Sequence, residues 1–232
     1  MIVDLSSYID HTLLKETVKI NEVDKICLEA SSENFAAVCI RHRYVAAAKS
    51  MLSGSGVKVA TVVAFPLGDG TIGSKVQAIN EALEAGADEV DMVIDICALK
   101  RGNWQQLEDE ISACLKPVIA ADKAIKLIVE SGILTDNELI GCCRLYSNFK
   151  IDFMKTSTGY AEFGATLHAV KLMKANLHPG IGIKASGGIK TYKFAKELVD
   201  AGATRLGCSA GMQIMKEFRE QMVGVGVMRQ LI

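Results

Sequence analysis

The chain has 232 residues, and half of them are hydrophobic, which is enough to bury a sizeable core. Its 26 basic and 27 acidic residues leave a net charge of -1, which gives no support for binding to nucleic acid or to a membrane surface. There is no signal-peptide pattern at the N-terminus, no apolar run near the roughly 20 residues of a membrane span, and no CxxC spacing among the seven cysteines, so we expect a cytoplasmic protein with reduced thiols.

Short apolar runs alternate with longer amphipathic segments along the whole chain, which predicts strands that alternate with helices. In chain order, the strands are expected at 8–11 (a weak candidate), 36–40, 57–65, 89–94, 125–130, 151–156, 182–185 and 204–208. The helices between and after them are expected at 21–33, 42–53, 73–85, 104–121, 135–147, 161–176 and 191–201, with one more after Gly211.

This alternation is typical of a parallel sheet whose faces are covered by helices. Eight strand–helix units in a chain of this length predict a single-domain (β/α)8 TIM barrel over residues 1–232. A quasi-repeat supports the units, because segments 84–91 and 200–207 both place a glycine after a helix and before a strand. No Pro/Gly/Ser-rich linker divides the chain. A doubly wound open sheet is the alternative, since the pattern cannot show closure of the sheet.

Two lysines, Lys155 and Lys184, lie at expected strand ends, and each is followed by a loop of small residues. A buried ammonium group is costly unless it has a partner or a lowered pKa. A second ammonium nearby disfavours charging of the first, which is what a Schiff-base nucleophile needs. A single strand-end lysine is more often solvated or paired. Together with Asp91 and Lys126 inside apolar strands, however, the two lysines favour a functional site.

A barrel binds its ligand at the C-terminal ends of the strands. That rule nominates the ionisable residues at expected strand ends, namely Asp10, Asp91, Glu130, Lys155 and Lys184. Cys39 lies near another strand end and is expected to be a core residue.

Three glycine-containing loops are candidates for a phosphate site. Gly159 follows Lys155, Gly187 and Gly188 precede a helix start, and Ser209 lies between two glycines before the last helix. The latter two loops follow strands seven and eight of the predicted barrel, where barrels commonly bind phosphate. The pattern therefore favours a small phosphorylated substrate.

Other chemistries find little support in the sequence. The four histidines show no HExxH or comparable metal spacing, which disfavours a zinc-dependent aldolase. No GxGxxG opens a helix, and no GxSxG or P-loop is present. We therefore expect neither a metal nor another cofactor.

Several motifs occur in a characteristic order over almost the whole chain. They are Asp10-His11-Thr12-Leu13-Leu14, the segment 89–93, Lys126 with Glu130, KTSTG at 155–159, KASGG at 184–188, and the segment 205–211. This set resembles the deoxyribose-phosphate aldolase family. The resemblance implies a metal-independent class I aldolase with a (β/α)8 barrel. Such an enzyme reversibly cleaves 2-deoxy-D-ribose 5-phosphate to acetaldehyde and D-glyceraldehyde 3-phosphate through a lysine Schiff base, in deoxyribose phosphate catabolism.

The resemblance also implies a role for each matching residue. Lys155 resembles the Schiff-base lysine, Lys184 the lysine that perturbs it, and Asp91 the proton-relay acid, with Asp10 and Lys126 in support. The residues expected to hold the phosphate are Gly159, Gly187, Gly188 and Ser209.

Two departures from the family bear on phosphate affinity. Tyr160 stands where some relatives carry a lysine, and Ala210 stands where others carry a serine.

Two other functions compete with this interpretation. One is a different Schiff-base aldolase, or a transaldolase-like enzyme, acting on another sugar phosphate. The other is a catalytically silent phosphosugar-binding protein, against which the retention of Lys155, Lys184 and Asp91 argues. The sequence leaves open whether the chain forms a homo-oligomer, either a dimer or a tetramer.

Overall fold

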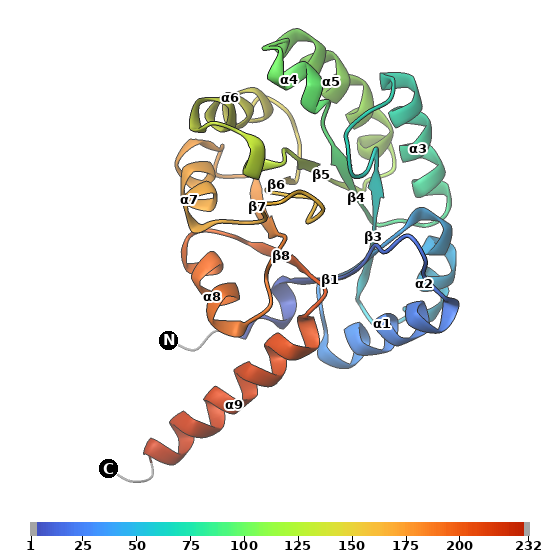
Figure 1. Cartoon of the computed structure of the whole chain (residues 1–232). Coiled ribbons are helices and arrows are strands. Elements are labelled where there is room, and N and C mark those ends of the chain that lie inside the picture. The colour runs from blue at the N-terminus through green and yellow to red at the C-terminus, as the bar shows by residue number, and fades with distance from the viewer. Residues whose placement is uncertain (1–3, 230–232) are drawn as a thin grey trace.

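The computed structural model describes residues 4–229, with side chains up to residue 223. In this part of the chain, eight parallel strands close into a barrel in sequence order, with helices around it (Figure 1). The strand β1 closes the barrel against β8, with Asp10 opposite Gly207. The predicted (β/α)8 TIM barrel is therefore confirmed, and the open doubly wound sheet is wrong.

The elements alternate as the sequence pattern indicates. The strands are β1 (Ile9–Leu13), β2 (Ala37–Ile40), β3 (Lys58–Val63), β4 (Glu89–Val93), β5 (Ala124–Ile128), β6 (Phe153–Lys155), β7 (Gly182–Ser186) and β8 (Arg205–Cys208). The helices are α1 (Ile20–Glu33), α2 (Val45–Met51), α3 (Ile72–Glu84), α4 (Ile96–Lys100), α5 (Trp104–Ala120), α6 (Asp136–Tyr146), α7 (Leu167–Asn176), α8 (Tyr192–Asp200) and α9 (Gly211–Arg229). Short 3-10 turns lie at Ser6–Tyr8, His42–Tyr44 and Ser131–Ile133.

The helix expected at 161–176 begins only at Leu167, and this prediction is wrong for its first six residues. The backbone N–H of Ala165 donates to the carbonyl oxygens of Ser186 and Gly187, in the loop after β7, rather than within a helix. A Cβ on Gly164 would lie 2.3 Å from the Gly187 carbonyl oxygen, so the two loops are in close contact. The segment therefore forms a loop that curls over the barrel centre (Figure 1).

Smaller differences occur where elements are short. The helix expected at 42–53 is a 3-10 turn followed by α2, and the strand expected at 8–11 runs over Ile9–Leu13. The five-residue α4 was not predicted, because it is too short to show helical periodicity. Its N-terminus is capped by Asp95, whose side chain accepts from the N–H of Ala98 at 2.8 Å.

Strand alternation separates an outer core from the barrel interior. On β2, Val38 and Ile40 belong to the large hydrophobic core, whereas Ala37 and Cys39 belong to a small separate cluster with Ala60 of β3. Cys39 is fully buried, as expected of a core residue. Small apolar side chains therefore fill the barrel beside β2 and β3.

Candidate active site

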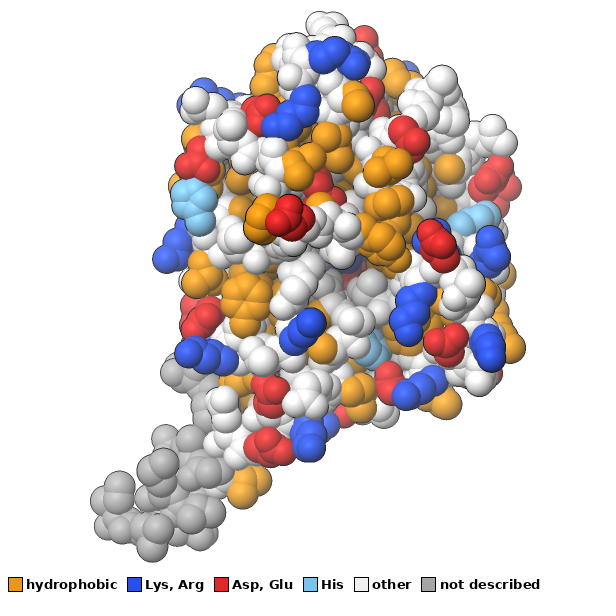
Figure 2. All heavy atoms as spheres, in the orientation of Figure 1, with side chains coloured by type: hydrophobic (Ala, Val, Ile, Leu, Met, Phe, Trp, Pro, Cys, Tyr) orange, Lys and Arg blue, Asp and Glu red, His pale blue; other side chains and the backbone are white. Residues whose placement is uncertain are grey.

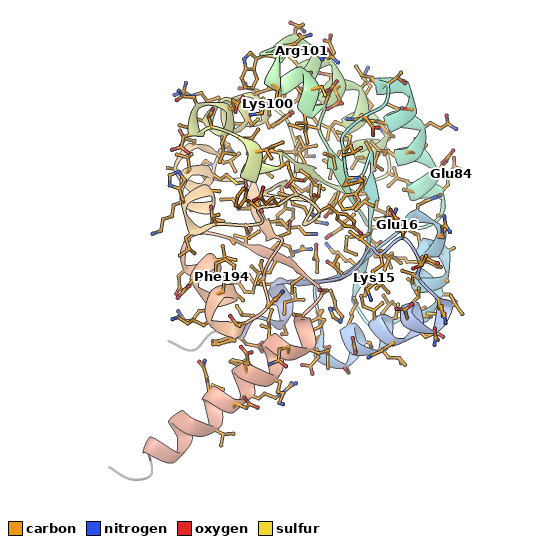
Figure 3. All side chains as sticks on the ribbon, viewed as in Figure 1. Lys15, Glu16, Glu84, Lys100, Arg101 and Phe194 are labelled. Carbon is orange, nitrogen blue, oxygen red and sulfur yellow. The ribbon has the colours of Figure 1, made fainter. Side chains whose placement is uncertain are left out.

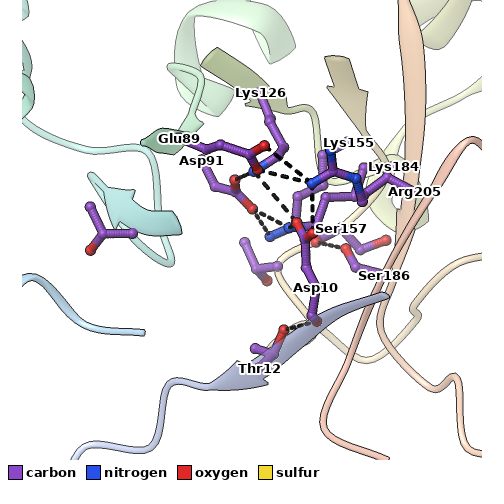
Figure 4. Close-up of polar contacts among 12 residues, drawn as sticks. Asp10, Thr12, Glu89, Asp91, Lys126, Lys155, Ser157, Lys184, Ser186 and Arg205 are labelled. Carbon is purple, nitrogen blue, oxygen red and sulfur yellow. Dashed lines mark hydrogen bonds and ion pairs between the residues drawn. The ribbon is translucent and has the colours of Figure 1, made fainter. Parts of the chain in front are cut away.

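The opposite side of the barrel interior is lined by ionised groups, drawn together in Figure 4. Three carboxylates and four cations are connected there by ion pairs. They are Asp10 of β1, Glu89 and Asp91 of β4, Lys126 of β5, Lys155 of β6, Lys184 of β7 and Arg205 of β8. We call these seven residues the barrel network.

Asp91 is the centre of the barrel network. Its Oδ2 accepts from Lys155 Nζ at 2.8 Å and from Lys184 Nζ at 2.7 Å, and its Oδ1 accepts from Lys126 Nζ at 2.7 Å. Strand register explains the convergence, because Lys155 pairs with Lys184 across β6 and β7, and Asp91 pairs with Lys126 across β4 and β5. The structure thus brings together Lys155, the last residue of β6, and Lys184 of β7 with Asp91 and Lys126.

A deeper layer of the network holds Lys184 and Lys126. Lys184 also donates to Asp10, and Lys126 lies 2.6 Å from a Glu89 oxygen. The Arg205 guanidinium joins the two carboxylates by donating to Asp10 at 2.7 Å and to Glu89 at 3.0 Å.

The expectation of a position at the C-terminal end of the strand is wrong for Asp10, Asp91 and Lys184, because Asp91 and Lys184 are the middle residues of five-residue strands. Asp10 is the second residue of β1, which continues to Leu13, so its side chain lies in the interior below the mouth.

Sequence reasoning also missed Glu89 and Arg205. The signal for Glu89 was available, because it lies two residues before Asp91 on the same face of β4.

The network makes Lys155 its most acidic ammonium group. Burial, and then the Lys184 ammonium, lower the pKa of Lys155 against the opposing effect of Asp91. Burial alone would lower the pKa of Lys184 as well, but the Asp10 and Asp91 carboxylates raise it. Burial would raise the pKa of Asp91, yet the three surrounding lysines hold it well below its ordinary value.

The number of carboxylate partners explains this difference. Lys126 is paired with three carboxylates and Lys184 with two, whereas Lys155 is paired only with Asp91. Three carboxylates can balance only three of the four cations. Release of a proton from Lys155 therefore brings the network closest to electrical neutrality.

Lys155 is also the one member of the barrel network that lines the cavity at the mouth, which has a volume of about 250 Å³. The lining includes every residue predicted to hold phosphate, namely Gly159, Gly187, Gly188 and Ser209. It also includes Tyr160, which the sequence singled out as a departure from the family, and Lys15 and Lys190, which sequence reasoning did not assign to the site. No carboxylate lines the cavity. Figure 2 shows basic side chains on this face around the opening, together with acidic and hydrophobic ones.

The loops that form the cavity are held by buried polar contacts. Glu130, nominated as a site residue, accepts from the backbone N–H of Thr158 at 3.2 Å and from its hydroxyl. It therefore positions the loop that carries Gly159 and does not line the cavity. Gly187 and Gly188 have φ values of 88° and 78°, a left-handed conformation in which a side chain would be strained.

The N-termini of two helices lie next to residues that line the cavity. Gly188 lies shortly before α8, whose first turn is capped by Thr191, and Ser209 lies two residues before the start of α9. At the start of α8, the N–H groups of Tyr192 and Phe194 already donate to Glu217 and Thr191. The start of α9, next to Ser209, is therefore the better helix terminus for an anion. The arrangement can therefore place a reactive amine and a bound anionic group in the same small cavity.

Among the described residues, no helix combines the length and apolar character needed to cross a membrane. The same part of the chain contains no group of three or more His, Cys, Asp or Glu side chains arranged to hold a metal ion.

Comparison with known proteins gives consistent matches over most of the chain. Residues 5–217 match the model of the DeoC/LacD family of aldolases. The deoxyribose-phosphate aldolase of Streptococcus equi subsp. zooepidemicus is 46% identical over 213 residues, which cover 92% of this chain and 96% of the relative. That of Caldanaerobacter subterraneus is 43% identical over 224 residues, covering 96% and 97%. The solved structure of the enzyme from Aeropyrum pernix, described as a unique tetramer, superposes with a TM-score of 0.87 at 29% identity and covers 93% of this chain and 91% of that one.

Proposed function

Because the chain belongs to the DeoC/LacD family of aldolases, we propose that it is a class I aldolase acting on 2-deoxy-D-ribose 5-phosphate. It would cleave this substrate reversibly to acetaldehyde and D-glyceraldehyde 3-phosphate through a Schiff base on Lys155, in deoxyribose phosphate catabolism. One observation carries the proposal: Lys155 is the network cation with a lowered pKa, and it alone of the network lines the cavity.

The first step is attack of the neutral Lys155 amine on C1 of the open-chain substrate. Asp91 lies 2.8 Å from the Lys155 nitrogen and is ionised at rest, so it can accept the proton that this nitrogen loses. Loss of water from the resulting carbinolamine leaves a positively charged Schiff base. Lys184 remains charged beside Asp91 throughout, because Asp10 and Asp91 raise its pKa.

Carbon–carbon cleavage follows from the charge on the Schiff base. Removal of the proton from the C3 hydroxyl breaks the C2–C3 bond, and the bonding electrons move toward the iminium nitrogen to leave an enamine on Lys155. The phosphorylated three-carbon aldehyde departs first. Protonation of the enamine carbon and hydrolysis then release acetaldehyde and restore the amine.

The phosphate would lie against the glycine loops, with Gly159, Gly187, Gly188 and Ser209 as its contacts. The left-handed glycines allow close approach of the backbone, and the start of α9 favours negative charge. Ser209→Glu would introduce a carboxylate at this end. We expect kcat/KM to fall strongly for deoxyribose 5-phosphate and much less for unphosphorylated deoxyribose. An equal loss for both substrates would mean that the phosphate lies elsewhere.

Borohydride trapping tests the nucleophile directly. Incubation with substrate and borohydride should reduce the Schiff base and leave a stable adduct on Lys155, located by peptide mass spectrometry. An adduct found only on Lys184 or Lys126 would reverse the assignment. Binding of the sugar phosphate without any turnover would instead support a catalytically silent protein.

We also propose a cytoplasmic location, a single domain over residues 1–232, and a homo-oligomer. The tetrameric description of the Aeropyrum pernix relative supports self-association in general. Light scattering of the purified protein would distinguish a monomer from a dimer or a tetramer.

A further inference from the structure

The loop after β1 brings an unpaired lysine to the mouth of the barrel. Lys15 is exposed, lines the cavity together with Gly188 and Ser209, and has no ion-pair partner among the described residues. Figure 3 places Lys15 on this loop, which reaches the mouth from the β1 side. Since no carboxylate lines the cavity, its charge is free to act on a bound anion.

Three hydrogen bonds hold the backbone that carries Lys15. The Tyr160 hydroxyl donates to the carbonyl oxygen of Leu14 at 2.7 Å. Arg41 Nε donates to the same oxygen at 2.9 Å and to the carbonyl oxygen of Lys15 at 3.1 Å. These donors come from the loops after β6 and β2, so the position of Lys15 is set from two sides.

Tyr160 also connects Lys15 with the predicted phosphate loop. Tyr160 directly follows Gly159, and its N–H donates to the Thr158 hydroxyl at 3.1 Å. Its ring packs edge-on against Phe65, with centroids 5.1 Å apart, from the loop after β3. The side chain therefore bridges the loops after β1, β3 and β6 across the mouth.

We infer that Lys15 is a phosphate-binding residue that closes the anion site from the β1 side, with Tyr160 and Arg41 as its positioning residues. The inference rests on the proposed aldolase function. It identifies Lys15 as a residue that would make the enzyme prefer a phosphorylated substrate. Lys190 reaches the same cavity from the loop after β7. The phosphate would thus be held by two ammonium groups from the loops after β1 and β7, which flank the loop after β8 that carries Ser209.

The test compares kcat/KM for deoxyribose 5-phosphate with kcat/KM for unphosphorylated deoxyribose. Lys15→Met should lower the ratio about 10- to 100-fold, because a charge-assisted contact to phosphate is lost. Lys15→Arg should restore most of it. The matched control is Lys19→Met, since Lys19 is an exposed lysine near the end of the same loop that does not line the cavity.

Tyr160→Phe removes only the hydroxyl and should raise KM for the phosphorylated substrate about 3- to 10-fold, with little change in kcat. Tyr44→Phe is its control, because the Tyr44 hydroxyl donates to the Val18 carbonyl oxygen at 2.6 Å in the same loop, away from the cavity. If Tyr160 acts through Lys15, the double variant Lys15→Met/Tyr160→Phe should be no worse than Lys15→Met alone.

An unchanged ratio in Lys15→Met, or an equal loss for both substrates, would overturn the inference. Calorimetric binding of inorganic phosphate keeps it testable without turnover, and Lys15→Met should weaken that binding relative to Lys19→Met. The protein could also bind phosphate through Lys15 and yet cleave neither substrate. That result would contradict the proposed function but would agree with this inference.

Discussion

Replacing Lys184 with methionine tests the proposed activation of Lys155 by the barrel network. Both lysine nitrogens donate to the same Asp91 oxygen, at 2.7 Å and 2.8 Å. They therefore lie no more than about 5.5 Å apart, where two unit charges repel by about 3 kcal/mol at an effective dielectric constant of about 20. Methionine keeps an unbranched stem of similar length but removes the charge.

Without this repulsion, Lys155 should hold its proton more tightly and its pKa should rise. Since about 1.4 kcal/mol corresponds to a factor of ten, the neutral amine at neutral pH should become roughly a hundredfold scarcer. We expect kcat/KM for aldol cleavage to fall by a similar factor at neutral pH. It should recover toward the wild-type value at alkaline pH, as Lys155 loses its proton.

The complete pH profile of kcat/KM therefore tests whether the charge of Lys184 lowers the pKa of Lys155. A uniform loss of activity at every pH would show that Lys184 relays protons or maintains the structure and does not set the pKa of Lys155. An unchanged profile would refute the electrostatic argument outright. Lys126→Met is the matched control, because Lys126 is equally buried but contacts the other Asp91 oxygen and should shift the profile less.

Three further substitutions probe the network. Asp91→Asn removes the acceptor shared by both lysines, so kcat should fall at least roughly 100-fold with little change in substrate KM, as measured by steady-state kinetics. Gly207→Ala would place a methyl group 2.9 Å from Lys184 Cε and should displace the Lys184 side chain. The pH profile of kcat/KM should then shift toward alkaline pH, but less than in Lys184→Met, and an unaltered profile would contradict this. Arg205→Met leaves two buried carboxylates short of a cation and should lower the free energy of unfolding in urea by about 3–5 kcal/mol. Burial alone would raise the pKa of Asp10, but the Lys184, Lys126 and Arg205 cations lower it below 3.8 in the folded protein. The ionised Asp10 therefore stabilises the fold above pH 3.8, and this stabilisation is lost as the pH falls through the pKa of Asp10 in the folded protein. The Arg205 variant should therefore unfold in acid at a higher pH than wild type, as followed by circular dichroism.

The fold could be predicted because the barrel depends on local periodicity repeated eight times. Buried parallel strands appear as short apolar runs, and most of the expected elements agree with the structure to within a few residues. The segment 161–166 shows the limit of this reasoning. Its sequence is compatible with a helix, but Gly164 packs on Gly187 from another loop, and this contact overrides the local pattern.

The site was predictable in part for a related reason. An ammonium or carboxylate inside an apolar run needs a partner, which drew attention to Lys126, Lys155, Lys184 and Asp91 before any partner was known. The contact between Tyr160 and the Leu14 carbonyl gave no such signal. It joins residues 146 positions apart, and they meet only because closure of the barrel brings the loops after β6 and β1 to the same mouth.

The assignment of roles among the lysines depends on register, which residue types alone do not provide. The apolar runs set Lys126, inside a strand, apart from Lys155 and Lys184 at expected strand ends, but they do not distinguish Lys155 from Lys184. In the barrel, Lys126 and Lys184 reach the deeper carboxylates, whereas Lys155 reaches only Asp91 and the cavity. The lysine with the fewest carboxylate partners is thus the one that can lose its proton and meet a substrate. In the proposed mechanism, the deeper carboxylates would serve catalysis by keeping Lys184 charged, because that charge disfavours a proton on Lys155.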